Sequence, residues 1–202
     1  MSTRYLAAIG CGAALALTLL VTPVAFAEDA KTKEVEVKDI KLDVPETWKA
    51  KPTPPNGFRA AQFEIPPVEG DQEGAELVVF HFGPNGGGGV QANIERWVKQ
   101  FEAEERKLKI FNGKTKQGEY VLVDLSGTWN KPVGPPIAMK TTKAPGSRFL
   151  GVILKPETGG DYYIRLTGPE KTVAANAKTF RVAIKADPEK EMEKKQDTEK
   201  KE

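Results

Sequence analysis

The amino-acid sequence predicts an α+β fold in which a mainly antiparallel sheet is packed with two main helices. Strand-like runs cluster with gaps short enough for hairpins, which favours antiparallel pairing. One stretch in the middle of the chain repeats its apolar residues with the period of a helix, and a second such stretch lies near the end. The order strands, helix, strands, helix therefore indicates a single sheet-based domain.

The first half of the domain supplies three strand-like segments. Residues 34–44 alternate and end at Pro45, residues 58–65 end at Pro66, and residues 75–82 form the clearest strand. This last segment carries apolar residues on both of its faces, which is typical of a strand covered from both sides. We therefore expect it near the centre of the sheet.

The best-supported helix spans residues 91–106. Its apolar side chains recur at positions i, i+3, i+4 and i+7, whereas charged residues fill the opposite side. The apolar positions are Ile94, Trp97, Val98 and Phe101. This stripe predicts a helix that packs one side against the sheet.

The second half repeats the strand signals and ends in a helix. Residues 119–125, 148–155 and 161–167 are strand-rich. A final helix begins at Gly168-Pro169, where Thr167 and Glu170 have the spacing of a capping box. Its predicted buried stripe consists of Val173, Ala177, Phe180 and Ile184.

The two ends of the chain differ in composition from the domain between them. Residues 1–27 read as a cleavable signal peptide, with Arg4, an apolar run and a small-residue cleavage site. Residues 28–33 form a polar lead-in, residues 34–186 the single globular domain, and residues 187–202 a disordered charged tail. This organisation predicts a secreted or periplasmic protein with no membrane span in the mature chain.

Composition argues against several classes of function. Removal of residues 1–27 takes one of the 30 basic residues and no acidic one, so that 29 basic side chains face 28 acidic ones. Such a balance does not steer a protein to nucleic acid. Cys11, the single cysteine, lies within the same segment, so the mature chain has neither a disulfide nor a thiolate ligand.

Several phrases resemble a group of exported bacterial proteins of uncharacterised function. They are VVFHFGP at 78–84, GGVQANIERWVKQF at 88–101, DLSGTW at 124–129 and YIRLTGPEKTV at 163–173. The order of elements, with a Pro-x-x-Trp motif at 45–48, also resembles the PsbP-like fold of photosynthetic extrinsic proteins and nuclear Ran-release factors. The resemblance implies an α/β/α sandwich and a binding or assembly role, without a shared catalytic residue set.

The glycine run Gly86, Gly87, Gly88 and Gly89 is the first candidate site. Backbone N–H groups at a helix start, freed by glycine, can hold an anion, so a phosphate, sulfate or carboxylate could lie over this loop. No Lys-Ser or Lys-Thr follows the run, and no GxGxxG pattern is present. The simpler interpretation is a flexible connection between strand and helix.

Catalytic and metal chemistry have few candidates. His81 is the single histidine, and a metal site around it would need two or three further ligands. Ser126 and Ser147 lie in no G-x-S-x-G elbow, and a triad with His81 and Asp124 would need a coincidence of the fold. We therefore predict no catalytic residues, no metal and no cofactor.

Two further residues are candidates for ligand contacts. Trp129 lies in a Gly/Pro-rich stretch and is either an exposed aromatic platform or a cap over the sheet. Arg165 lies in a strand-like run, where it could face Asp124 across the sheet or lie on the solvent side.

The sequence thus predicts an exported, non-catalytic binding or accessory module. Its partner is expected to be an envelope protein or a small anionic ligand. One alternative is an enzyme acting on an anionic small molecule held by residues 86–89. Another is a structural component of the envelope that is engaged through the charged tail.

Overall fold

The computed structural model describes residues 31–55, 57–134 and 138–194. The predicted signal peptide, residues 28–30 of the lead-in and the end of the charged tail lie outside the described residues. Within the described ranges, no helix has the length and apolar character needed to cross a membrane.

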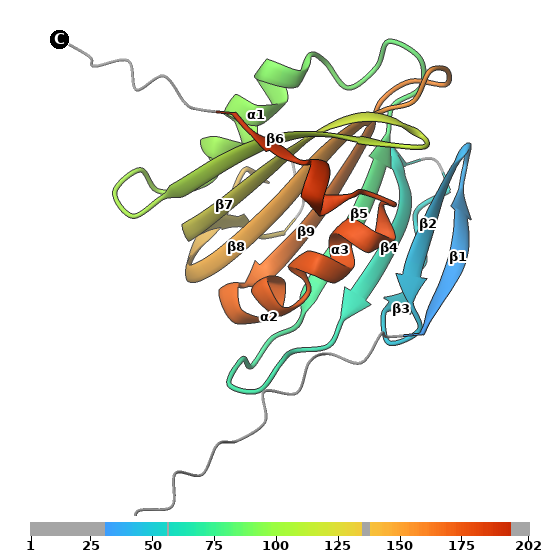
Figure 1. Ribbon diagram of the computed structural model, residues 1–202. Coiled ribbons are helices and arrows are strands. Elements are labelled where there is room, and N and C mark those ends of the chain that lie inside the picture. Colours follow the sequence, from blue (N-terminus) through green and yellow to red (C-terminus); the bar gives the residue numbers. More distant parts are fainter. Residues whose placement is uncertain (1–30, 56, 135–137, 195–202) are drawn as a thin grey trace, which may run out of the picture.

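Strands dominate the described structure, and they form one large and one small sheet (Figure 1). The strands are β1 (Thr32–Val37), β2 (Ile40–Pro45), β3 (Lys49–Ala50), β4 (Arg59–Ile65), β5 (Ala75–His81), β6 (Lys107–Thr115), β7 (Gly118–Pro132), β8 (Thr141–Lys155), β9 (Tyr162–Pro169) and β10 (Met192–Glu193). The large sheet has the order β10-β6-β7-β8-β9-β5-β4-β3, and every neighbouring pair is antiparallel. β1 and β2 form a separate antiparallel hairpin.

Helices are short and few in the described part of the chain. They are α1 (Val90–Val98), α2 (Glu170–Ala175), α3 (Ala177–Ala183) and a 3-10 turn at Pro188–Lys190. The expected fold, an α/β/α sandwich balanced between a sheet and two main helices, is therefore wrong. The chain is sheet-dominated, because strands extend through segments that the sequence analysis assigned to helix or left between elements.

The largest error concerns the segment after α1. The helix predicted to reach residue 106 ends at Val98, and the Arg106 guanidinium donates to the carbonyl oxygens of Val98 and Phe101, each at 3.2 Å. β6 follows at once and pairs along its whole length with β7. Its Leu108 and Ile110 alternate with lysines, as expected for a strand.

Both ends of the domain also differ from the prediction. Residues 34–44 form a hairpin instead of one strand, with Lys38 at the turn in the left-handed region (φ 58°). The final helix breaks at Asn176 into α2 and α3. Its start is not held by a capping box, because the Asp71 carboxylate accepts from the backbone N–H and hydroxyl of Thr172, at 2.9 and 2.7 Å.

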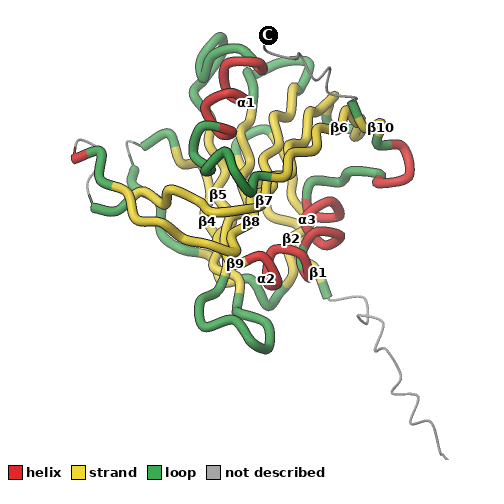
Figure 2. The backbone as a smooth tube through the Cα atoms, turned by 90° about the vertical axis from the view of Figure 1, so that its left-hand side faces the viewer, coloured by secondary structure: helices red, strands yellow, loops and turns green. Residues whose placement is uncertain are grey.

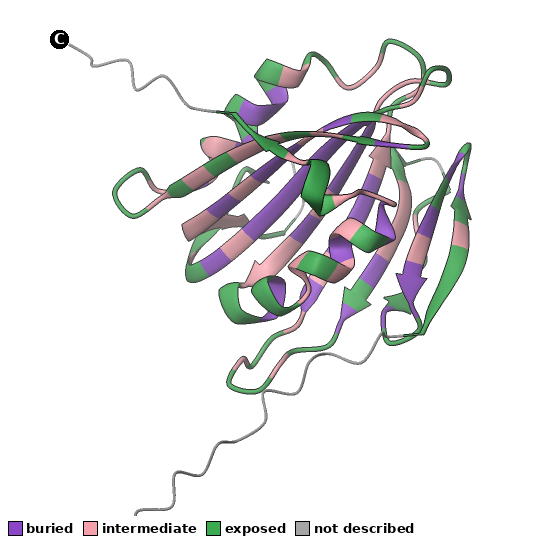
Figure 3. Cartoon of the chain, in the orientation of Figure 1, coloured by how far each residue is buried: buried purple, intermediate pink, exposed green. Residues whose placement is uncertain are grey.

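The face of the large sheet that carries α2, α3 and the β1–β2 hairpin is here called the α3 face. It is buried by a continuous apolar core, and Figure 3 shows buried residues running along the central strands. The predicted stripe of the last helix is confirmed, since Val173, Phe180 and Ile184 are buried in this core. β5 lies between β9 and β4, in the interior of the sheet as expected.

The charged segment after Ala186 continues to contact the domain. β10 pairs with β6, and the Glu191 side chain is buried against Arg181 of α3. The Tyr120 hydroxyl donates to the same carboxylate at 2.8 Å. The part of the predicted tail up to Lys194 is therefore attached by a specific ion pair despite its polar composition.

The opposite side of the sheet, here called the α1 face, has a second and smaller core. Ile94 and Trp97 of α1, with Phe101, pack on residues of β7, β8 and β9. The β7–β8 hairpin continues beyond this core as an arm of residues 128–134 and 138–146, which projects from the body below α1 (Figure 2). A bulge between Gly127 and Trp129 marks the start of the arm.

Candidate functional site

Beyond Tyr163 and Phe80, which contact the core of the α1 face, the part of this face formed by β9, β5 and β4 carries a polar and aromatic surface. Side chains alternate along each strand, so residues of odd number on β9 and even number on β5 point to this side. They include Arg165 of β9 and Phe80 of β5, while Arg59 reaches the same place from β4. This surface, defined by Arg59, Phe80 and Arg165, is the arginine cluster.

Two guanidinium groups share one phenyl ring in this cluster. The Cζ atom of Arg165 lies 4.3 Å from the ring centre of Phe80, and that of Arg59 lies 5.7 Å from it. Arg59 donates one hydrogen bond to the side-chain oxygen of Gln62 at 2.7 Å. Within the described residues neither arginine forms an ion pair, so two positive charges lie beside the same ring without a bound carboxylate.

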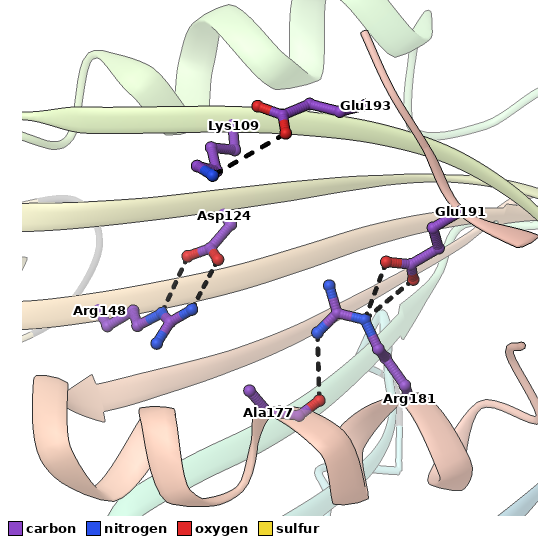
Figure 4. Close-up of polar contacts among 7 residues, drawn as sticks. All are labelled: Lys109, Asp124, Arg148, Ala177, Arg181, Glu191 and Glu193. Carbon is purple, nitrogen blue, oxygen red and sulfur yellow. Dashed lines mark hydrogen bonds and ion pairs between the residues drawn. The ribbon is translucent and has the colours of Figure 1, made fainter. Parts of the chain in front are cut away.

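Two other arginines, both on the α3 face, are each held by a carboxylate (Figure 4). Arg148 binds both oxygens of Asp124, at 2.9 and 2.6 Å. The Nε atom of Arg181 lies 3.0 and 2.9 Å from the two oxygens of Glu191. The hypothesis that Asp124 faces Arg165 is therefore wrong, because the two residues lie on opposite faces of the sheet.

The pKa of Arg165 reflects its burial and the second positive charge in the arginine cluster. Burial, together with the neighbouring charge of Arg59, lowers the pKa of Arg165 to about 10, and Glu76 acts weakly in the opposite direction. The Glu76 carboxylate accepts a hydrogen bond from the Gln62 amide instead of from either arginine. Arg165 remains charged at neutral pH, and an anion beside it would relieve the cost of its burial.

A groove of about 910 Å³ is lined by residues of β4, β5 and the arm, and none of the three residues of the arginine cluster lines it. Gln62, Glu64 and Glu76 line its floor, and Trp129 and Lys131 of the arm line one wall. Its charges are largely matched, since Lys131 pairs with Glu73 at 3.1 Å and Lys51 with Glu64 at 2.9 Å. The groove itself therefore offers no excess of positive charge.

Trp129 lines this groove but packs mainly against the protein. Its ring stacks on Phe101 at 6.5 Å between ring centres, with an interplanar angle of 19°. Its Nε1–H points to the side-chain oxygen of Gln100 at 3.4 Å. The residue thus joins the base of the arm to the end of α1, which corresponds to the capping interpretation.

Hydrogen bonds from neighbouring side chains to its carbonyl oxygens hold the glycine loop in place. The Asn93 amide donates to the carbonyl oxygens of Gly87 and Gly89, at 2.8 and 3.0 Å, and the Tyr163 hydroxyl donates to Gly88 at 2.8 Å. A Cβ atom on Gly87 would lie 2.4 Å from the Tyr163 ring, and Gly87 has a φ of 82°. Glycine is therefore required at this position for close packing on Tyr163.

A smaller hollow of about 330 Å³ lies beside the loop. It is lined by Gly86 and Gly88 together with residues 156–161, which include the carboxylates of Glu157 and Asp161. Among the residues that the structure describes, no basic side chain lines it. Binding of an anion at residues 86–89 stays a prediction, but the charges around this hollow repel one.

His81 lies at the end of β5 on the α3 face, away from the arginine cluster. Its ring stacks on Tyr162 at 4.4 Å, and its Nδ1 atom is buried without a hydrogen-bond partner. The Tyr162 hydroxyl in turn donates to Asp39 in the β1–β2 turn. These contacts are those of a packed aromatic side chain.

The residues considered for hydrolytic chemistry do not come together. Asp124 and Ser126 lie on β7, whereas His81 lies on β5, and β8 and β9 separate these two strands. Asp124 is engaged by Arg148, and Ser147 donates to the carbonyl of Ala144 at 2.9 Å. Among the described residues, no group of three or more histidine, cysteine, aspartate or glutamate side chains is arranged to hold a metal ion.

Of the ligand-contact residues predicted from the sequence, only Arg165 belongs to the arginine cluster. Arg59 was missed, and its role depends on an irregular register between β4 and β5 at Arg59 and Ala61. Phe80 could be assigned to one side of its strand by alternation alone, but the two arginines above it come from separate strands. A correct sheet order would have been needed to bring the three together.

Comparisons with known proteins add little to this geometry. No protein-family model matches the chain, and no curated protein matches it. Among solved structures, a Pseudomonas aeruginosa protein of unknown function is similar, with 14% identity and a TM-score of 0.42. The match covers 77% of this chain and 95% of that one. A likeness this distant carries no argument about function.

Proposed function

We propose that the chain is an exported, non-catalytic binding module that holds an anionic group of its ligand between Arg59 and Arg165. The observation that carries this proposal is the pair of guanidiniums on the ring of Phe80, which have no ion pair among the described residues. Guanidinium groups match carboxylate and phosphate oxygens in geometry and charge. A bound anion would supply the countercharge that Arg148 and Arg181 obtain within the protein.

The absence of a catalytic role is part of the proposal. The arginines can bind and orient an anion, but they are poor proton acceptors or donors near neutral pH. Glu76, the carboxylate whose charge acts on the pKa of Arg165, accepts a hydrogen bond from the Gln62 amide. The side chains around the cluster thus fit recognition better than acid–base or nucleophilic chemistry.

Nuclear magnetic resonance of the arginine Nε–H groups tests the binding site directly. Titration of acetate and of inorganic phosphate at low ionic strength should shift the Nε signals of Arg59 and Arg165 in a saturable manner. Arg148 and Arg181 serve as internal controls, because their carboxylate partners are already in place. Equal shifts at all four arginines, or no shifts, would contradict the proposal.

A pair of variants separates site binding from general charge. Arg165→Gln should abolish the saturable response of Arg59, because two guanidiniums hold the anion together. Lys116→Gln removes the same charge from an exposed position in the β6–β7 turn and should leave the titration unchanged.

Export is a second element of the proposal, supported by the sequence of residues 1–27. Expression of the full chain in a bacterial host should yield a periplasmic or extracellular product that begins at Glu28. Mass spectrometry of the recovered N-terminus measures this. A cytoplasmic product that keeps residues 1–27 would argue against export.

A further inference from the structure

Two large apolar side chains lie exposed beside the arginine cluster. Phe58 is 63% exposed and Phe82 is 37% exposed. Their ring centres are 4.8 Å apart with an interplanar angle of 36°, so they form one continuous surface, here called the aromatic shelf. Exposed single hydrophobic residues are common, but two phenylalanine rings in contact with each other beside unpaired charges are typical of a binding surface.

The shelf and the arginine cluster are joined by Phe80. The rings of Phe80 and Phe82 lie 6.4 Å apart and are nearly parallel, with an interplanar angle of 6°. Both guanidinium groups contact the ring of Phe80, and the ring of Phe82 contacts that of Phe58. Positive charge at one end and apolar surface at the other therefore form one continuous site on the α1 face.

The backbone around the shelf is fixed before any ligand binds. The His81 N–H donates to the carbonyl of Phe58 at 2.9 Å and holds the two chain segments together. The Tyr163 ring meets Phe82 edge-on at 5.6 Å between ring centres. Behind Phe82, a Cβ atom on Gly86 would lie 2.6 Å from the Phe82 Cβ, so the glycine loop packs closely against the shelf. A preformed site of this kind loses little conformational entropy on binding.

We infer that the ligand is an amphipathic anion, whose carboxylate or phosphate binds Arg59 and Arg165 and whose apolar chain lies on Phe58 and Phe82. This inference rests on the proposed function and adds the chemical class of the ligand. The charged group provides orientation through the two guanidiniums, and burial of the chain on the shelf provides most of the affinity.

A series of straight-chain carboxylates tests the inference on the wild-type protein. Acetate, butanoate, hexanoate and octanoate carry the same charge and differ in apolar length. Affinity measured from the Arg165 Nε shift should rise along the series, with octanoate at least tenfold tighter than acetate, because each buried methylene adds to binding. Equal affinities would overturn the inference and leave the proposed anion site intact, whereas the absence of any response would refute both.

A double variant locates the apolar part of the ligand. Phe58→Ser with Phe82→Ser should reduce octanoate affinity to that of acetate and leave acetate binding unchanged. Val182→Ser is the matched control, since Val182 is 44% exposed on α3, on the other side of the sheet. Loss of octanoate affinity in the control, or its retention in the double variant, would contradict the assignment. The wild-type series remains decisive if the double variant does not fold.

A carboxylate or phosphate on an apolar chain occurs both in free acids and at the surface of an anionic lipid bilayer. We assign the ligand as a free acid. Sedimentation with vesicles of phosphatidylglycerol and phosphatidylcholine distinguishes the two sources. We expect no co-sedimentation of the wild-type protein. Vesicle binding that requires Phe58 and Phe82, without a rise in affinity along the carboxylate series, would overturn the assignment to a soluble ligand.

Discussion

On the α3 face of the sheet, Arg148 and Arg181 are each held by a carboxylate, whereas on the α1 face Arg59 and Arg165 share the ring of Phe80 and form no ion pair among the described residues. The α3 face is also closed by two helices and a hairpin, while β9, β5 and β4 leave part of the α1 face uncovered. The difference separates two uses of one residue type. A paired arginine fastens elements of the fold together, whereas an unpaired one is, in our proposal, available to bind an anion.

The largest effect is expected from breaking the most buried pair. In the ion pair of Arg181 and Glu191 the side chains are 13% and 5% exposed. Glu191→Ala would leave the guanidinium buried and would deprive the Tyr120 hydroxyl of its acceptor, so we expect a loss of about 3–5 kcal/mol in the free energy of unfolding. Urea denaturation measures this loss. A change below about 1 kcal/mol would mean that the attachment of β10 is incidental.

Neither face could be derived from the sequence in full. Alternation predicted β4, β5 and β9, and the apolar stripes predicted the buried sides of α1 and of the last helix, because these signals are local. The partners of Arg148 and Arg181 could not be predicted, since each pair joins segments whose register depends on the whole sheet. Glu191 is the clearest case, because a run of charged residues is typical of a solvated tail and here one member is buried.

The arginine cluster and the aromatic shelf of the α1 face could not be predicted for a related reason. The glycine run and His81 were candidate binding residues because such features are rare in the chain, but in the structure both make packing contacts. Arg59 and Phe58 follow a proline-rich turn and carry no motif. Their role arises where β4 is placed beside β5, a long-range pairing that local patterns do not specify.

A second prediction concerns the glycine loop that packs behind the aromatic shelf. Gly87→Ala should destabilise the protein by about 1–3 kcal/mol, because the residue has a positive φ and a new Cβ would collide with Tyr163. Gly89→Ala is the matched control, since its Cβ would meet no atom within 4 Å and its backbone is extended. Equal effects in the two variants, measured by urea denaturation, would show that the loop is not fixed by Tyr163.

A third prediction concerns the cost of an unpaired arginine. Arg165→Met should change the free energy of unfolding by no more than about 1 kcal/mol, or should raise it, because an apolar side chain replaces a desolvated cation that has no carboxylate. This result would contrast with the large loss expected for Glu191→Ala. A loss of about 3 kcal/mol or more would indicate that Arg165 supports the fold as the arginines of the α3 face do.

The pH dependence of this variant follows from the pKa of Arg165, which burial and the neighbouring charge of Arg59 lower in the folded protein to about 10, well below its ordinary value. Below pH 10 the side chain is charged in both states, and the folded protein carries the full cost of burying it. As pH rises above about 10, the folded state releases this proton before the unfolded state does, and the cost diminishes. Any stability advantage of Arg165→Met should therefore be largest near neutral pH and should shrink above pH 10.

The smallest effect is expected where an ion pair of the α3 face is partly exposed to solvent. Lys185, at the end of α3, lies 2.9 Å from both Glu34 and Asp43 of the β1–β2 hairpin, and these carboxylates raise its pKa. Hydrogen bonds from Lys41 and Lys185 lower the pKa of Glu34. These ion pairs should therefore stabilise the folded protein at intermediate pH. The stabilisation should fade as pH falls below about 4.5, through the lowered pKa of Glu34, and as pH rises above about 10.5, through the raised pKa of Lys185.

Lys185→Met should lower the Tm slightly at neutral pH and low salt, and 1 M salt should remove most of the difference, since exposed ion pairs are screened. A large loss that persists in salt would mean that Lys185 acts through packing, and that the hairpin is fastened to α3 as firmly as β10 is.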